Sequence, residues 1–179
     1  MNGKVKIIGL MLLVFLIMVV AYKSDFFIKK PGTVKGLITW QYNDFVGTKP
    51  DVGATVFLLP SSCSNKIKDE DAVSYFLGTK APSGFYYAKA NGNGNYEIPN
   101  VKAGQYTMVI ISKNTNRNVL EKIDIDFLKE YILTDFFSKD KVEYFCTVNI
   151  NIHQFVNKDI KVEPKTTLDL SNDFGNTYF

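Results

Sequence analysis

Residues Gly94–Tyr106, with the sequence GNYEIPNVKAGQY, decide the fold of this chain. Two Asn-Gly pairs at residues 91–94 lead into this stretch, and they favour a tight turn that requires positive φ angles. Tyr96 and Ile98 then alternate with polar residues, which is typical of a strand with one buried face. The stretch therefore predicts a tight turn followed by a strand over 95–98.

The segments on either side of this stretch show the same alternation of apolar and polar residues. A strand over 85–90 precedes the Asn-Gly turn, and its position predicts a hairpin with the strand over 95–98. About seven strands in all, separated by glycine and proline turns, predict a mainly β fold: an antiparallel β-sandwich. The predicted strands cover residues 34–40, 54–58, 85–90, 95–98, 105–112, 142–152 and 166–170.

Two segments break the strand pattern and predict helical insertions, near 61–84 and 120–140. In the first, the acidic run Asp69–Asp71 precedes an apolar stripe, and Gly78 follows it, as at the start and end of a short helix. In the second, apolar residues share one face over about 124–137. We expect this helix to pack over a sheet edge or an end of the sandwich rather than to lie on a membrane, because its polar face is acidic.

The region 32–112 resembles the carboxypeptidase regulatory-like domain family, which has a transthyretin-like (prealbumin-like) β-sandwich. The resemblance rests on GTVKGLI at 32–38, VGATVFL at 52–58 and the stretch Gly94–Tyr106. It implies an accessory or surface module without catalysis. The turn and core signature of the resemblance consists of Gly92, Gly94, Tyr96, Gly104 and Tyr106.

The N-terminal residues predict a membrane or export signal. Residues 7–22 carry no charge, and Lys4 and Lys6 precede them. A basic start before an apolar run is typical of a signal anchor or a signal peptide over residues 1–23, with the remainder outside the cytoplasm. We expect a retained transmembrane helix in the cell membrane; the alternative is secretion after cleavage near Ala21. The predicted organisation continues with a linker over 24–31, the domain over 32–172 and a tail over 173–179.

The charge balance gives no reason to expect a nucleic-acid partner. The 179 residues include 21 basic and 18 acidic side chains, a formal charge of +3. Lys4 and Lys6 belong to the flank of the apolar run, so the rest of the chain holds 19 basic groups against 18 acidic ones. The basic excess therefore reflects membrane orientation.

The residues that could carry chemistry are few, and we expect no catalytic residue, no cofactor and no metal. His153 is the only histidine, which excludes zinc sites built from several histidines. No glycine loop of the phosphate- or dinucleotide-binding kind is present. Cys63 and Cys146 are the only cysteines, and outside the cytoplasm they could form a disulfide. Cys146 also falls on the apolar side of the strand predicted over 142–152, which suits a buried thiol.

Three aromatic residues are candidate ligand contacts: Trp40, Tyr86 and Tyr87. Trp40 shares its phase with Val34 and Ile38, which favours a buried position. Tyr86 and Tyr87 must lie on opposite faces, so we expect one of them to point outward. Together these observations predict a non-enzymatic, membrane-anchored extracytoplasmic β-sandwich module that mediates protein or cell-envelope interactions. The alternative is a carbohydrate-binding module of similar fold.

Overall fold

The computed structural model describes residues 30–62, 66–117 and 132–176, together with residues 11, 13, 15, 16 and 18. The chain divides into two compact units, Met1–Lys30 and Pro31–Phe179. In the first unit, residues 11, 13, 15, 16 and 18 are helical and exposed. No helix within the described residues reaches the length and hydropathy of a membrane span. Most of the predicted apolar run over 7–22 lies outside those residues, so the anchor stays a prediction.

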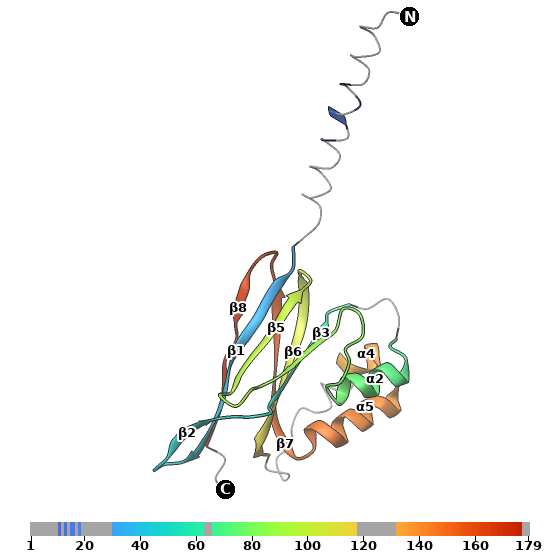
Figure 1. Cartoon of the computed structure of the whole chain (residues 1–179). Coiled ribbons are helices and arrows are strands. Elements are labelled where there is room, and N and C mark those ends of the chain that lie inside the picture. Colours follow the sequence, from blue (N-terminus) through green and yellow to red (C-terminus); the bar gives the residue numbers. More distant parts are fainter. Residues whose placement is uncertain are drawn as a thin grey trace, which may run out of the picture. The chain divides into compact units, whose positions relative to one another are not determined.

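The second unit contains two β-sheets (Figure 1). Strand β1 is the centre of the first sheet, which we call sheet one. Its strands are β1 (Gly32–Asn43), β2 (Gly47–Pro50), β5 (Asn95–Val101), β8 (Thr167–Asp169) and β9 (Asn172–Asn176). Sheet two has the order β4 (Tyr86–Lys89), β3 (Thr55–Pro60), β6 (Gly104–Asn116) and β7 (His153–Val162).

An apolar core between the two sheets makes the fold a β-sandwich. Sheet one contributes Val34, Ile38 and Ile98, while sheet two contributes Val56 and Met108, and all five are at most 3% exposed. These residues alternate with others along their strands, as the predicted period of two requires. The mainly β sandwich expected from the sequence is therefore confirmed.

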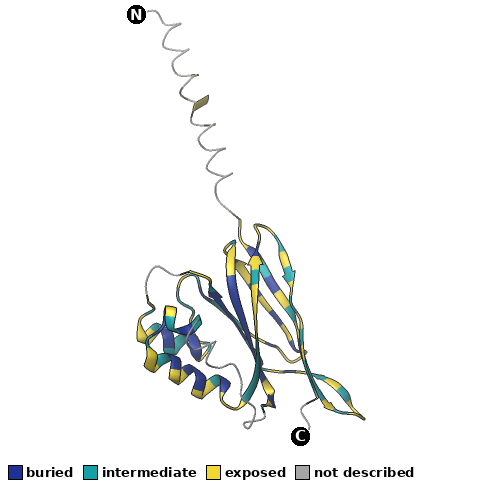
Figure 2. Cartoon of the chain, turned by 180° about the vertical axis from the view of Figure 1, so that it is seen from behind, coloured by how far each residue is buried: buried dark blue, intermediate teal, exposed yellow. Residues whose placement is uncertain are grey.

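A layer of helices covers the outer face of sheet two (Figures 1 and 2). It consists of α2 (Asp69–Phe76), α4 (Thr134–Phe136), α5 (Lys139–Phe145) and the π-helical turn η2 (Cys146–Ile150). A second apolar cluster fills the space between this layer and the sheet, and Phe57 of β3 and Val109 of β6 form part of its floor. Strands β3 and β6 are therefore buried on both faces.

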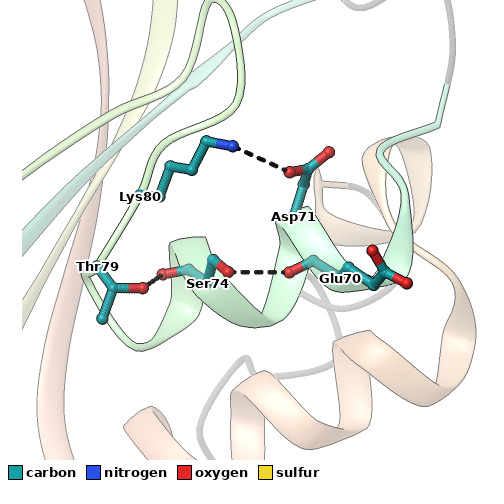
Figure 3. A network of polar contacts seen from close by, with 5 residues as sticks. All are labelled: Glu70, Asp71, Ser74, Thr79 and Lys80. Carbon is teal, nitrogen blue, oxygen red and sulfur yellow. Dashed lines mark hydrogen bonds and ion pairs between the residues drawn. The ribbon is translucent and has the colours of Figure 1, made fainter.

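Helix α2 begins and ends where the sequence predicts. Three acidic residues occupy its first turn, and Gly78 follows it with a φ angle of +62°. Figure 3 shows how the chain after the helix is held: Lys80 forms an ion pair with Asp71 at 3.8 Å, and the Thr79 hydroxyl donates to the Ser74 carbonyl at 2.8 Å. The acidic residues therefore stabilise the first turn of α2, and Asp71 also binds the chain that follows the helix.

The strand predicted over 142–152 is wrong, because residues 142–150 belong to α5 and η2. The buried side chains recur at helical intervals: Val142, Phe145, Cys146 and Ile150. The other apolar residues of the segment are at least 37% exposed: Tyr144, Val148 and Ile152. Apolar residues occur in this segment both at every second position, as in a strand, and at every third or fourth position, as in a helix. The residues with the helical spacing are the ones that pack against sheet two. The strand that pairs with β6 is instead β7, which follows the helix.

The hairpin predicted between 85–90 and 95–98 is also wrong, although its turn is present. The Asn91 amide donates to the Asn95 carbonyl at 2.9 Å, and Gly94 has a φ angle of +77°. However, β4 before the turn pairs with β3, whereas β5 after it pairs with β1. The chain thus passes from one sheet to the other, because Phe85 and Tyr87 before the turn pack under the helical layer.

The C-terminal region differs from the prediction in two ways. The last predicted strand, over 166–170, is confirmed as β8, but the tail expected from residue 173 contains β9. Both strands pair with β1 in parallel, so sheet one is mixed rather than antiparallel. Most of the helix predicted over 124–137 lies outside the described residues; its last part corresponds to α4.

A buried carboxylate holds the end of β6. Asp51 has no exposed surface, and five hydrogen bonds from residues 112–114 reach its two oxygens. They come from the Ser112 hydroxyl, the Lys113 amide, which donates to both oxygens, and the amide and side chain of Asn114. The ladder between β6 and β7 is irregular after Ile111, and Asp51 binds the chain at this irregularity.

Candidate functional site

The β1–β2 hairpin, residues 39–50, extends beyond the rest of the sandwich in Figures 1 and 2. Its turn is held by Asn43, whose side-chain oxygen accepts hydrogen bonds from the amides of Phe45 at 3.0 Å and Val46 at 2.6 Å. Gly47 follows with a φ angle of +73°. The turn leaves Phe45 100% exposed and Val46 54% exposed. An ordered turn therefore presents two apolar side chains to solvent.

Aromatic side chains continue from this turn along the hairpin. The rings of Trp40 and Tyr42 meet edge to face with centroids 5.6 Å apart. The Lys49 ammonium lies 3.6 Å from the centroid of the Tyr42 ring, in cation–π geometry. Trp40 is half-buried rather than buried, because Ile38 is the last β1 residue in the core between the sheets. We call Trp40, Tyr42, Phe45, Val46 and Lys49 the hairpin patch.

Tyr86 and Tyr87 lie on opposite faces of sheet two, as their adjacent positions require. Tyr86 packs against the core between the sheets, and Tyr87 packs under the helical layer. Both are half-buried, so neither is the outward residue that we expected. The Tyr86 hydroxyl accepts a hydrogen bond from the Lys102 amide at 3.1 Å. In the described structure these side chains are packing residues, and the hairpin patch does not include them.

The two tyrosines on which the predicted family resemblance partly rests bind the backbone. The Tyr96 hydroxyl donates to the Leu170 carbonyl at 2.7 Å, and the Tyr106 hydroxyl donates to the Lys102 carbonyl at 2.8 Å. Burial, with a smaller contribution from Tyr86, raises the pKa of Tyr106 to about 12. Both hydroxyls therefore stay neutral donors at physiological pH, and both fix loops of the sandwich.

The two glycines of the Asn-Gly turn, Gly92 and Gly94, have different surroundings. Replacing each with alanine therefore tests which of them the turn requires. A Cβ on Gly94 would lie 2.6 Å from the Ile38 carbonyl oxygen, and its φ angle of +77° is strained for any other residue. We expect Gly94→Ala to lower the free energy of unfolding by about 2 kcal/mol or more. Gly92→Ala meets no atom of the described residues within 4 Å, and we expect a change within about 0.5 kcal/mol. Urea denaturation would measure both; equal losses would contradict the assigned role of Gly94.

The remaining sequence candidates are dispersed. Gly104 begins β6, and His153 begins β7 and is half-buried. Cys146 is buried in η2, whereas Cys63 lies outside the described residues, so their disulfide stays a prediction. Over the residues that the structure describes, no group of three His, Cys, Asp or Glu side chains could hold a metal ion.

A cleft of about 560 Å³ lies on the outer face of sheet two, beside α4. Its floor is polar and comes from alternate residues of the two neighbouring strands: Gln105 and Thr107 of β6 and Asn157, Asp159 and Lys161 of β7. We call it the polar cleft. Tyr106 and Phe136 line it but are each 4% exposed. The polar cleft thus offers hydrogen-bonding groups rather than aromatic faces.

The sequence predicted Trp40 of the hairpin patch as a candidate ligand contact, and it missed Phe45, Val46 and Lys49. A signal was present in Asn43-Asp44-Phe45-Val46-Gly47, where turn-forming residues flank two apolar ones. Apolar residues inside a turn cannot be buried by the strands that the turn connects, so this pattern itself indicates exposure.

Comparison with protein-family models and with curated proteins found no match. Among solved structures, a minor pilin of Streptococcus agalactiae is similar with a TM-score of 0.45 and 10% identity, covering 85% of this chain and 47% of the pilin chain. A proposed carbohydrate-binding protein of Pseudomonas aeruginosa is similar with a TM-score of 0.43 and 10% identity, covering 80% of this chain and 88% of that chain. This chain therefore spans about half the length of the pilin. The carboxypeptidase regulatory-like family stays a prediction.

Proposed function

We propose that this chain is a non-enzymatic β-sandwich module that binds a protein of the cell envelope through the hairpin patch. The exposure of Phe45 and Val46 at an ordered turn carries this proposal. Single exposed apolar residues are common on protein surfaces, but contiguous ones mark contact sites. Aromatic residues are also enriched where proteins bind each other. The edge-to-face pair of Trp40 and Tyr42 extends the apolar area beyond the turn.

Photo-crosslinking tests this interaction directly. A photoreactive phenylalanine analogue at position 45 of the full chain is expected to give a discrete protein adduct in intact cells. The same analogue at position 102, an exposed residue between β5 and β6, is expected to give none. With the partner isolated from the adduct, Phe45→Ser is expected to weaken its binding by about 30-fold, the loss typical of a central interface residue. Absence of an adduct at 45, or an equal one at 102, would contradict the proposal.

The proposed location is the cell membrane, with the β-sandwich outside the cytoplasm. Support comes from the uncharged run over 7–22 and the lysines before it. Protease added to intact spheroplasts is expected to degrade the sandwich while the chain stays in the membrane fraction after alkaline extraction. A mature chain that lacks residues 1–21 and leaves the membrane would instead support secretion.

Carbohydrate binding is the second candidate, and the polar cleft favours it. Carboxylate and amide side chains such as Asp159 and Asn157 are suitable partners for sugar hydroxyls. Affinity electrophoresis in gels that contain cell-wall polysaccharides is the test. Retardation that is lost in Asp159→Ala and kept in Asp173→Ala, an exposed residue of β9, would support this function. Absence of retardation on every polysaccharide would remove it.

A further inference from the structure

A separate cleft of about 410 Å³ lies where the helical layer meets sheet two. Its floor includes Thr55 of β3, and its walls include Leu77 after α2 and Asn149 of η2. Three basic side chains from three strands also line it: Lys89 of β4, Lys113 of β6 and His153 of β7. We call this the basic cleft. Its volume lies within the range of pockets that bind small ligands.

Among the residues that the structure describes, no carboxylate lines the basic cleft. Within the described residues neither Lys89 nor Lys113 forms an ion pair. The Lys89 ammonium donates to the Leu77 carbonyl at 3.4 Å, which uses one of its three hydrogens. The two lysines therefore present positive charge that no described acidic side chain neutralises.

His153 supplies a third nitrogen. Its Nδ1 atom is shielded from solvent and has no hydrogen-bond partner among the described residues, whereas Nε2 is not shielded in this way. A neutral imidazole carries its proton on one nitrogen only. Because Nδ1 has no acceptor, the proton is better placed on Nε2. The ring thus offers Nε2 as a hydrogen-bond donor, and His153 is one of the residues that line the cleft.

The nearest buried acidic group does not line the cleft. Asp51 lies behind Ser112, and the five hydrogen bonds from residues 112–114 satisfy its oxygens. The Lys113 amide takes part in them, so the backbone of this lysine is held in place. Asn149 is held as well, because its side-chain amide donates to the Phe145 carbonyl at 3.3 Å. Hydrogen bonds therefore hold two residues of the cleft wall, Lys113 and Asn149, in place.

We propose that the basic cleft binds an oxyanion, a phosphate or a carboxylate group, through Lys89, Lys113 and His153. Charge-assisted hydrogen bonds from ammonium and imidazole groups are the usual means of holding such a group. The cleft belongs to sheet two and the helical layer, whereas the hairpin patch belongs to sheet one. This binding therefore goes beyond the proposed function and can be tested apart from it.

The single histidine provides the readout, because all imidazole ring signals in a proton NMR spectrum of the full chain come from His153. Sodium phosphate and sodium acetate are titrated separately at constant pH and constant ionic strength, with sodium chloride as the reference. We expect a saturable shift of the His153 signal with phosphate, with acetate or with both. A shift with phosphate alone assigns a phosphate ligand, and a shift with acetate alone assigns a carboxylate ligand.

The double variant Lys89→Gln and Lys113→Gln is expected to weaken the anion affinity by at least about tenfold, the loss that one charged hydrogen bond produces. The control, Lys66→Gln and Lys102→Gln, removes the same charge from exposed positions outside the cleft. It is expected to change the affinity less than twofold. Lys113→Gln alone, at an exposed position, keeps the test valid if the double variant fails to fold. Shifts no larger than those with chloride, or equal losses in the control, would overturn the proposal.

Discussion

Replacing Asp51 with alanine is expected to lower the free energy of unfolding by about 3–5 kcal/mol. A buried donor that loses its partner costs about 1–3 kcal/mol, and this change removes the acceptor of the Ser112 hydroxyl and of two backbone amides. Asp51 is fully buried, so these donors are left away from bulk solvent when the carboxylate is removed. Urea denaturation followed by circular dichroism measures the loss.

Two variants separate the hydrogen bonds of Asp51 from its charge and size. Asp51→Asn keeps the shape but turns one acceptor into a donor, and we expect a loss of about 2 kcal/mol. Asp140→Ala removes an exposed carboxylate from the first turn of α5, and we expect less than about 1 kcal/mol. A loss in Asp51→Ala as small as that in Asp140→Ala would show that the five hydrogen bonds do not hold the end of β6.

Phe76→Ala is expected to cost about 3–5 kcal/mol, the usual range for a buried phenylalanine. Phe76 is 2% exposed, and its ring lies 4.7 Å from that of Phe137 and 4.6 Å from that of Phe145, centroid to centroid. It therefore joins α2 to α5 and to the segment after α4. The matched control is Phe45→Ala, the same change at a residue that is 100% exposed. We expect less than about 0.5 kcal/mol for the control.

The same variant tests whether the helical layer and the sandwich unfold together. Strands β3 and β6 contribute to both apolar clusters, so loss of the helical layer exposes one face of the central strands. We therefore expect a single transition. Trp40, the only tryptophan, reports on sheet one by fluorescence, and far-ultraviolet circular dichroism reports on the helices. Transitions that differ between the two probes in Phe76→Ala would contradict this coupling.

The elements predicted correctly are those whose sequence satisfies only one periodicity. Strand β1 alternates cleanly from Val34 to Ile38, and α2 has an acidic start and a glycine stop. The segment 142–152 satisfies two periodicities, because Phe145 lies between Tyr144 and Cys146 and all three are apolar. A helix that includes a π-helical turn and one buried face cannot be distinguished there from an alternating strand.

The candidate site was less predictable than the fold, because exposure depends on what covers a residue. Trp40 continues the phase of Ile38, yet it is only half-buried since sheet two does not cover the end of β1. Tyr87 could have been outward, but the helical layer covers it. The basic cleft joins Lys89, Lys113 and His153 from three strands, and no spacing in the sequence relates residues this far apart.

The sequence by itself determined the Asn-Gly turn and the start of strand β5, because the φ angle that Gly94 requires and the alternation around Tyr96 are properties of neighbouring residues. Only the tertiary structure decided which strands pair, since β4 and β5 leave the same turn for different sheets. It also decided that a helical layer covers sheet two and that Phe45 has no cover at all. The burial of a residue depends on contacts with segments that are distant in the sequence. The surfaces left exposed for binding therefore depend on the tertiary structure.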